Sequence, residues 1–285
     1  MTREAPDSQP ADREAPFAAV AGWPAAHSLS PAMMAHWLAV SGIQGRYGVL
    51  EIPPERFARA VHAARATAMA GLNVTVPHKT AALILADELS DAARRVGAAN
   101  LLIFQGDGRI RADNTDVVGV SAALREDAGS GPAVLIGAGG AARAALFHLS
   151  AQDREIRIVN RTRETAERLS AEFGLEALLY ETPETDALKG AGLVINATSL
   201  GMAGKPLLAP DFTVCAPGAL AFDMVYTPLQ TPFLIAARQA GLKTSDGLSM
   251  LIGQARPSFE AFFGASPPEG GGVRALLEAR LEGRR

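Results

Sequence analysis

Cysteine is almost missing from this chain of 285 residues, in which Cys215 is the single one. One cysteine allows neither an internal disulfide nor a cluster of thiolates around a metal. The five histidines show no spacing typical of metal ligands, so we expect no metal site. His27 and His78 are interpreted as ordinary surface or cleft residues.

The chain also lacks an excess of charge and a long uninterrupted hydrophobic run. Its 27 basic and 30 acidic residues give a formal net charge of −3, whereas a broad nucleic-acid surface or a polybasic membrane anchor needs a basic excess. The longest apolar stretch, residues 133–149, is interrupted by glycines, Arg143 and His148, so no transmembrane helix is predicted. We therefore expect a soluble cytoplasmic protein that binds neither nucleic acid nor a membrane.

Length and patterning predict two α/β domains. At roughly 100 to 200 residues per domain, this length favours two domains or one large one. Residues 1–16 carry charges of both signs and three prolines without an apolar segment, which indicates a flexible tail. Beyond the tail, short apolar runs alternate with helical stretches, an order typical of mostly parallel sheets covered by helices. Segments 101–105 and 109–112 are predicted to form a hairpin, the one antiparallel pair.

A polar break at residues 126–132 precedes a second pattern, which is typical of a dinucleotide-binding domain. An apolar strand at residues 133–136 leads directly into the motif G-x-G-x-x-A at Gly137 to Ala142, and a helix follows. The glycines allow a tight turn and let a pyrophosphate approach the backbone amides at the start of the helix. The alternative is a glycine-rich turn with a purely structural role.

The end of the next strand, residues 155–159, distinguishes between the two nicotinamide cofactors. NAD sites usually carry Asp or Glu there, whereas this chain has Asn160-Arg161-Thr162 followed by Arg163. A carboxylate would repel the 2′-phosphate of NADP, and Arg161 would bind it through charge-assisted hydrogen bonds. The sequence therefore favours NADP, unless Arg161 is simply a solvated residue at a helix start.

Polar residues of the first domain indicate a second site. In the predicted strand 71–76, Asn73 and Thr75 alternate with apolar residues and share one face. Lys79 follows in the first turn of a helix, where the helix dipole favours anions, so its position suggests a function unless Lys79 is simply an exposed residue. Asp116 starts another helix, and it either caps that helix or pairs with Lys79 across a cleft.

Two serines stand before the first predicted helix. Ser30 precedes Pro31 and is therefore a natural N-cap, which leaves Ser28 as the better candidate for ligand contact. No G-x-S-x-G motif accompanies these serines, so hydrolase chemistry has no support in the sequence.

Taken in order, these motifs resemble the shikimate dehydrogenase family over nearly the whole chain after the tail. The matching segments are Gly22-Trp23-Pro24, His27 to Pro31, Asn73 to Lys79, Asn100, Asn114-Thr115-Asp116, Gly137 to Ala142, Asn160 to Thr162, Asn196 to Ser199, Asp223 to Tyr226, Asp246-Gly247-Leu248 and Gln254. The resemblance implies a substrate domain at residues 17–116, an NADP-binding Rossmann-type domain at 117–247, and C-terminal helices at 248–285 that return to the first domain. It also implies NADPH-dependent reduction of 3-dehydroshikimate to shikimate in the biosynthesis of chorismate and the aromatic amino acids.

The resemblance also assigns roles to individual residues. Lys79 and Asp116 become the catalytic pair, which supplies a proton while the nicotinamide supplies a hydride. The implied substrate-binding residues are Ser28, Ser30, Asn73, Thr75, Asn100, Tyr226 and Gln254. The implied cofactor-binding residues are Asp91, Gly137, Ala138, Gly139, Gly140, Ala141, Asn160, Arg161, Thr162, Arg163, Met224 and Gly247.

Two departures from the family pattern and three alternatives stay open. Leu101 replaces a common threonine, and Thr165 replaces a second basic residue whose role Arg163 would take over. The alternatives are a quinate/shikimate dehydrogenase that prefers NAD, a non-catalytic NADP-binding sensor, and a related two-domain enzyme such as a folate dehydrogenase. The protein is expected to be a monomer or a homodimer. Its domains would close on glycine hinges near the crossover, at Gly119, Gly129 and Gly131.

Overall fold

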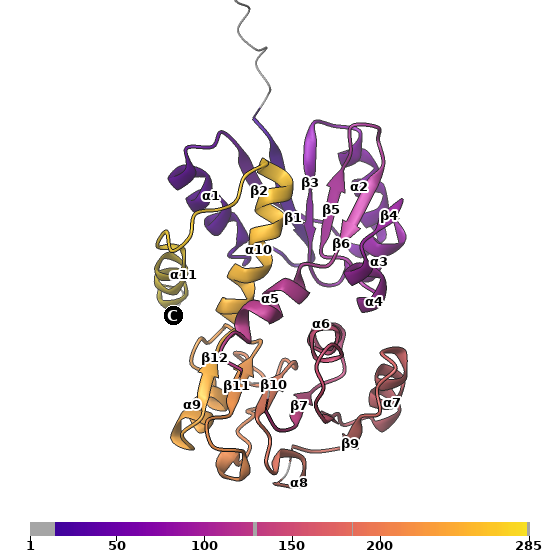
Figure 1. Ribbon diagram of the computed structural model, residues 1–285. Coiled ribbons are helices and arrows are strands. Elements are labelled where there is room, and N and C mark those ends of the chain that lie inside the picture. Colours follow the sequence, from indigo (N-terminus) through magenta and orange to yellow (C-terminus); the bar gives the residue numbers. More distant parts are fainter. Residues whose placement is uncertain (1–14, 128–129, 184, 284–285) are drawn as a thin grey trace, which may run out of the picture.

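The computed structural model describes residues 15–127, 130–183 and 185–283, which form two α/β lobes, each built on a six-stranded sheet (Figure 1). Residues 1–14 of the predicted tail and Gly129, one of the expected hinges, lie outside the described residues. We call the lobe around the first sheet the first lobe and the other the second lobe. The predicted α/β fold with two domains is confirmed.

The first lobe contains a mixed sheet. Its strands are β1 (Phe17–Gly22), β2 (Arg46–Glu51), β3 (Met69–Val74), β4 (Glu88–Leu89), β5 (Leu101–Phe104) and β6 (Ile110–Asp113). Their order is β2-β1-β3-β5-β6-β4, and β1 is parallel to both β2 and β3. The predicted β5–β6 hairpin is confirmed, but β5 is also antiparallel to β3, because it starts opposite Asn73 near the end of β3 and runs back. The prediction of a single antiparallel pair was therefore wrong.

Helices alternate with the strands of the first lobe along the chain. These helices are α1 (Ser30–Ser41), α2 (Phe57–Arg65), α3 (Lys79–Ile84) and α4 (Asp91–Val96), with a 3₁₀ turn η1 (Pro54–Arg56) before α2. β3 ends two residues earlier than predicted, and Val76 beyond it is 69% exposed.

His78 is buried, because its ring stacks on Phe57 and its Nε2 lies 2.7 Å from the Ile52 carbonyl oxygen. Its interpretation as a surface or cleft residue was wrong.

The second lobe is a doubly wound parallel sheet. Its elements are α5 (Asp116–Ala123), β7 (Ala133–Ile136), α6 (Gly140–Leu149), β8 (Ile156–Val159), α7 (Arg163–Glu172), β9 (Leu178–Tyr180), α8 (Thr185–Leu188), β10 (Leu193–Asn196), η2 (Phe212–Val214), β11 (Leu220–Asp223), α9 (Pro232–Gln239) and β12 (Lys243–Ser245). The strand order β12-β11-β10-β7-β8-β9 reverses direction between β7 and β10. Such a switch point is where open parallel sheets of this kind bind dinucleotides, at the carboxyl ends of the strands.

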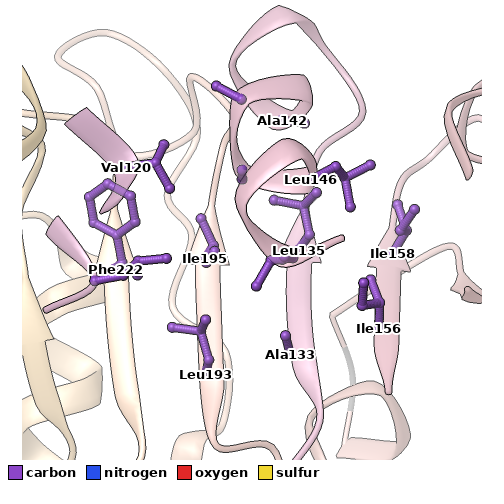
Figure 2. Packing of buried hydrophobic residues seen from close by; sticks show 14 of the residues in the cluster. Val120, Ala133, Leu135, Ala142, Leu146, Ile156, Ile158, Leu193, Ile195 and Phe222 are labelled. Atoms are coloured by element: carbon purple, nitrogen blue, oxygen red, sulfur yellow. The ribbon is translucent and has the colours of Figure 1, made fainter. Parts of the chain in front are cut away.

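The core of the second lobe explains why its central strands are continuous apolar runs. Figure 2 shows Leu135 of β7 packed beneath Leu146 of α6, with Ile158 and Ile195 on the neighbouring strands. Val134 and its alternate neighbours face a second buried cluster on the other side of the sheet. Because both faces are covered, these strands show no polar alternation.

The C-terminal helices return to the first lobe, as predicted. Helix α10 (Gly247–Phe263) lies along the first sheet and contacts β3 and β5, and α11 (Val273–Glu282) packs against α1 (Figure 1). Helix α10 also packs closely on α5, the helix that leads from one lobe to the other. No helix in the described part of the chain is long and apolar enough to cross a membrane.

Gly119 was expected to be a hinge, but it lies inside α5 and allows α10 to approach closely. A Cβ atom at this position would lie 2.6 Å from the backbone oxygen of Met250. The absence of a side chain is therefore a packing requirement of the α5–α10 contact.

Replacing Gly119 with alanine should therefore lower the free energy of unfolding by about 1 to 3 kcal/mol, because the two helices must separate to admit the methyl group. The matched control is Gly106→Ala in the β5–β6 turn, where an added Cβ would meet nothing within 4 Å. Urea unfolding of both variants checks the prediction. Equal stabilities would show that Gly119 does not limit the helix separation.

Candidate active site

All nine predicted catalytic and substrate-binding residues line one cavity between the lobes. The cavity has a volume of about 240 Å³. It is lined by Ser28, Ser30, Asn73, Thr75, Lys79, Asn100, Asp116, Tyr226 and Gln254, together with Val20, Pro24, Ala25, His27, Val74 and Leu251. The apolar residues of this lining were assigned no role from the sequence. His27 was interpreted as a surface or cleft residue, and it lines the cavity. Because hydroxyl, amide, ammonium and carboxylate groups surround so small a space, the cavity suits a small, highly polar ligand.

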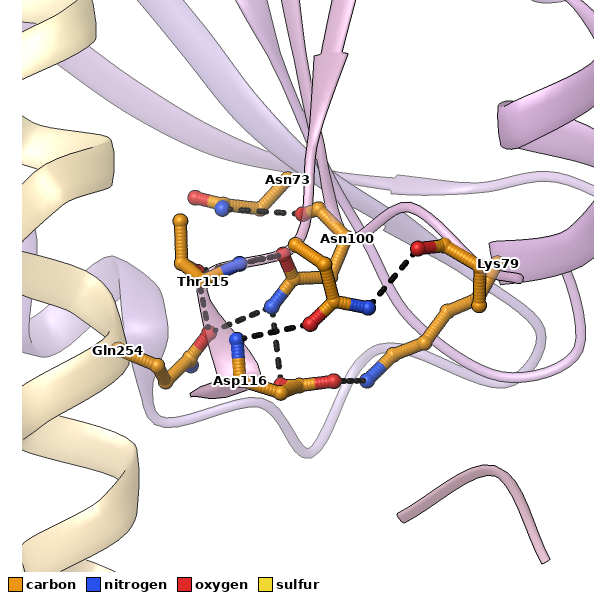
Figure 3. A network of polar contacts seen from close by, with 8 residues as sticks. Asn73, Lys79, Asn100, Thr115, Asp116 and Gln254 are labelled. Atoms are coloured by element: carbon orange, nitrogen blue, oxygen red, sulfur yellow. Dashed lines mark hydrogen bonds and ion pairs between the residues drawn. The ribbon is translucent and has the colours of Figure 1, made fainter. Parts of the chain in front are cut away.

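Lys79 and Asp116 form an ion pair inside this cavity. The Lys79 Nζ lies 2.5 Å from Asp116 Oδ2, and the two side chains are 30% and 11% exposed (Figure 3). Asp116 is the first residue of α5, but Thr115 occupies the N-cap position, so the carboxylate does not serve as a cap. Of the two roles open for Asp116 in the sequence, the pairing with Lys79 is the one observed. An ammonium held in this way at the start of α3 can donate a proton to a ligand in the cavity.

Asn100 connects the ion pair to the opposite wall. Its Nδ2 donates to Asp116 Oδ1 at 2.9 Å and to Gln254 Oε1 at 3.1 Å, while its Oδ1 accepts from the Thr115 amide at 2.7 Å (Figure 3). Both amide hydrogens of Asn100 are thus donated to protein atoms, so a ligand contact from Asn100 would have to share them. Asn100 therefore holds Asp116 and Gln254 in defined orientations.

Asn73 is similarly engaged with its surroundings. Its Nδ2 donates to the Asn100 backbone oxygen at 3.2 Å and to Ser258 Oγ at 2.8 Å, and its Oδ1 accepts from the Tyr47 hydroxyl at 2.8 Å. Burial raises the pKa of the Tyr47 hydroxyl, which keeps it protonated and able to donate. Asn73 lines the cavity, but its side chain joins β3 to its neighbours: its Nδ2 donates to Asn100 and to Ser258 of α10, and its Oδ1 accepts from Tyr47 of β2. Sequence reasoning missed Tyr47 and Ser258, because a lone polar residue in a predicted strand or helix carries no motif.

Ser28 and Ser30 differ from the predicted division of roles. Helix α1 begins at Ser30 with Leu29 as N-cap residue, and no side chain caps it. Instead, the Ser28 hydroxyl accepts a hydrogen bond from the Ser30 amide at 3.2 Å. The prediction of Ser30 as N-cap was wrong. Because neither hydroxyl caps the helix and both line the cavity, both serines are available to a ligand.

The glycine-rich loop of the second lobe has the features of an anion-binding turn. Gly137 has a φ of +107°, a conformation that other residues rarely adopt. Added Cβ atoms at Gly139 and Gly140 would meet nothing within 4 Å, so packing within the protein does not require glycine there. The first amides of α6 have no intrahelical partner and no side chain caps them, an arrangement that suits binding of an anion such as a phosphate group.

Arg161 lies at the end of β8, beside the glycine-rich loop. Its side chain is exposed and makes no hydrogen bond or ion pair with any residue in the described part of the chain. Arg163, in contrast, pairs with Glu167 at 3.0 Å. Asn160 donates from Nδ2 to the Thr162 carbonyl oxygen at 2.7 Å, which shapes the turn that carries Arg161. A free guanidinium at this place suits a ligand with a second phosphate group.

The remaining predicted cofactor residues are divided between the lobes. Gly247 packs directly against Met224, since an added Cβ would lie 2.2 Å from the Met224 backbone oxygen. Asp91 is an exposed residue that opens α4 in the first lobe, and it is not among the residues that line the cavity. The structure thus brings Met224 and Gly247 together, whereas the role of Asp91 stays a prediction.

A buried carboxylate supports the carboxyl ends of β10 and β11. Asp223 accepts hydrogen bonds from Asn196 Nδ2 at 2.9 Å, the Val225 amide at 3.0 Å and the Thr231 hydroxyl at 2.6 Å. Burial raises the pKa of Asp223 above its usual value, although these hydrogen bonds oppose the shift. The matching sequence segments included Asn196 and Asp223, but neither residue was given a role.

The raised pKa of Asp223 predicts a pH-dependent stability. Its stabilising contribution is present below the ordinary pKa of an aspartate and is lost as pH rises through the higher pKa of the folded state. Relative to Asp223→Asn, the unsubstituted chain should therefore lose stability as pH rises from about 4 toward neutrality, as measured by urea unfolding. Asp211→Asn is the control of opposite sign, because hydrogen bonds from Thr213 lower the pKa of Asp211. Parallel pH profiles of both variants and the unsubstituted chain would contradict the prediction.

Known proteins match most of this chain in sequence. A sequence profile described as the shikimate dehydrogenase substrate binding domain matches residues 20–102, and one described as shikimate / quinate 5-dehydrogenase matches residues 122–205. A Paracoccus denitrificans (strain Pd 1222) protein named shikimate dehydrogenase (NADP(+)) is 47% identical over 268 residues, which cover 92% of this chain and 95% of that protein. A Rhodospirillum rubrum protein of the same name is 47% identical over 277 residues, covering 93% and 97% of the two chains.

A solved structure extends the likeness to three dimensions. Shikimate 5-dehydrogenase from Thermus thermophilus, crystallised in complex with NADP(H) and shikimate, superposes with a TM-score of 0.82 at 37% identity. The match covers 93% of this chain and 99% of that one, and so includes both lobes. Together with the sequence motifs and the two-lobed fold, these matches show that the chain belongs to the shikimate dehydrogenase family.

Proposed function

We propose that this chain catalyses the NADPH-dependent, reversible reduction of 3-dehydroshikimate to shikimate, in the biosynthesis of chorismate and the aromatic amino acids. The observation that carries the proposal is the Lys79–Asp116 ion pair inside a small polar cavity that opens between the two lobes. The names of the relatives and the ligands of the Thermus thermophilus structure support the same activity. In this proposal, residues 17–116 with 248–285 form the substrate domain and 117–247 the cofactor domain.

The cavity lining suits a small acid that carries several hydroxyl groups. Ser28 and Ser30 are hydroxyl donors that are not used as helix caps, and Thr75, Tyr226 and Gln254 add further polar groups. Lys79 adds a positive charge. A cavity with so many hydrogen-bonding partners discriminates strongly against analogues that leave one of them unpaired. In this assignment, Asn73 and Asn100 act mainly by holding the other groups in place.

The second lobe fits NADP. Gly137 to Ala141 and the start of α6 would hold the pyrophosphate, and Arg161, with Asn160, Thr162 and Arg163 beside it, the 2′-phosphate. Met224 and Gly247 would border the nicotinamide end, because they lie at the carboxyl end of β11 and the start of α10. When bound, NADPH supplies the hydride that converts a carbonyl carbon to an alcohol carbon.

The residues of the first lobe supply the proton. Lys79 Nζ donates a proton to the carbonyl oxygen as that oxygen becomes a hydroxyl, and it removes the proton in the reverse reaction. Asp116 holds the ammonium in position through its Oδ2 and is itself oriented by Asn100 at its Oδ1. After the transfer, Lys79 takes up a proton from solvent, and the pair returns to its starting charge.

An assay of four substrate and cofactor combinations tests the proposal. Purified protein is mixed with shikimate or quinate and with NADP⁺ or NAD⁺, and the absorbance of the reduced nicotinamide is followed. We expect the highest kcat/KM with shikimate and NADP⁺. Higher activity with NAD⁺ or quinate would favour the NAD-preferring quinate/shikimate dehydrogenase, and no activity with any combination would favour the NADP-binding sensor. The cytoplasmic location and the monomeric or dimeric state stay predictions from the sequence.

A further inference from the structure

Thr115 occupies an N-cap position without capping its helix. Threonine is favoured there because its hydroxyl can accept a hydrogen bond from an amide of the first turn. In this chain the Thr115 side chain makes no such bond, and the residue is only 1% exposed. Its hydroxyl is instead directed to the cavity wall, 3.2 Å from Asn100 Oδ1 and 3.3 Å from Gln254 Oε1. The Thr115 hydroxyl therefore bonds to two residues of the cavity wall and not to an amide of its own helix.

The surrounding groups determine which way the Asn100 amide faces. The Thr115 amide can only donate, so the Asn100 atom beside it at 2.7 Å must be the oxygen. The Asp116 carboxylate accepts, so the Asn100 atom beside it at 2.9 Å must be the nitrogen. The orientation of Asn100 therefore follows from two partners that each allow a single arrangement.

The orientation of Gln254 follows from that of Asn100. Because Asn100 presents an N–H at 3.1 Å, the Gln254 atom opposite must be its oxygen. Asn100 Oδ1 and Gln254 Oε1 each accept one other hydrogen bond and have a second lone pair. The single hydroxyl hydrogen of Thr115 is therefore shared between these two oxygens, at 3.2 and 3.3 Å, and so bonds to Gln254 Oε1 directly. The Gln254 Nε2 has no hydrogen-bond partner among the described residues, and Gln254 lines the cavity. Its two N–H groups are therefore available to a ligand.

We propose that Thr115 is a positioning residue that, together with Asn100, holds Gln254 with its amide nitrogen toward the cavity and so sets the substrate specificity there. The ligand group that faces Gln254 must then accept a hydrogen bond, as a hydroxyl or carboxylate oxygen does. This inference rests on the proposed function, because it assigns to Gln254 a hydroxyl or carboxylate oxygen of shikimate. Thr115 acts through Gln254 and does not itself touch the substrate.

The test uses two substitutions at this position, one that removes the hydroxyl and one that keeps it. Thr115→Val removes the hydroxyl and keeps the shape, and it should raise the KM for shikimate about tenfold, the effect expected for one hydrogen bond in a buried network. The KM for NADP⁺ should change by less than about twofold, and kcat by less than the KM for shikimate. Thr115→Ser keeps the hydroxyl and should restore the KM for shikimate to within about threefold of the original value.

A double-mutant cycle shows whether Thr115 acts through Gln254. Gln254→Leu removes the amide, so adding Thr115→Val to it should leave the KM for shikimate unchanged. If Thr115→Val has the same effect with and without Gln254, or if Thr115→Ser does not restore the KM, the proposal is wrong. Should Thr115→Val fail to fold, the smaller Thr115→Ala takes its place in the same cycle.

The unsubstituted protein separates this inference from the proposed function. If it oxidises shikimate with NADP⁺ but the Thr115→Val variant has an unchanged KM, only the role of Thr115 is overturned. If the unsubstituted protein is inactive with shikimate, the proposed function itself is wrong. Equal increases in the KM values for shikimate and NADP⁺ would mean that the substitution disturbs the fold, which also overturns the proposal.

Discussion

Replacing Lys79 with alanine should lower kcat by about one hundred- to ten thousandfold, the range expected for the loss of a positioned proton donor. The Lys79 ammonium lies 2.5 Å from Asp116 within the cavity, and no other lysine lines that cavity in the described part of the chain. The KM for shikimate should change much less than kcat, because the hydroxyl and amide partners of the substrate remain. Steady-state kinetics in both directions check the prediction.

The matched control is Lys243→Ala, which removes an exposed lysine from the edge strand β12 of the second lobe. Its kcat should equal that of the unsubstituted protein. Unchanged turnover of Lys79→Ala would remove this residue from catalysis. Added primary amines distinguish two remaining roles: if Lys79 transfers a proton, rescue of the variant should depend on the pKa of the amine, whereas a lysine that only polarises the carbonyl should show no such dependence.

Arg161→Ala should raise the KM for NADPH by about ten- to one hundredfold and that for NADH by less than about threefold. The physical reason is the loss of charge-assisted hydrogen bonds to a phosphate that NADH does not carry. Arg161 has no competing partner among the described residues, so its whole guanidinium is available to the cofactor. The comparison of the two cofactors in the same preparation checks the prediction, because a general loss of stability affects both alike.

Arg163→Ala provides the control for this experiment. Its guanidinium pairs with Glu167 on an exposed face of α7, so its loss should change the KM for NADPH less than the loss of Arg161. Equal effects of Arg161→Ala on both cofactors would refute a 2′-phosphate role. An effect of Arg163→Ala as large as that of Arg161→Ala would show that Arg163 replaces the basic residue missing at Thr165.

Local patterns predicted the elements around the glycine-rich loop better than those at the sheet edges. The strand at residues 133–136 was predicted with its observed bounds, because a buried parallel strand leaves a clear sequence signal. The helix after the glycine-rich motif was also predicted, but it begins at Gly140, inside the motif, and not after Ala142. The short strands β4, β9 and β12 were not predicted. Strands of two or three residues carry too little periodicity to be recognised, and their pairing depends on a sheet that is already formed.

The sequence by itself determined the fold class, the two domains, the glycine-rich turn, and the residue types that surround the site. These features depend on residues near one another in the chain, where spacing and side-chain chemistry suffice. Only the tertiary structure decided that Asp116 pairs with Lys79 and that neither Ser30 nor Thr115 caps its helix. The reason is that a polar side chain bonds to the partners that folding brings within reach, and for Asp116 and Thr115 these partners, Lys79 and Gln254, lie far away in the chain.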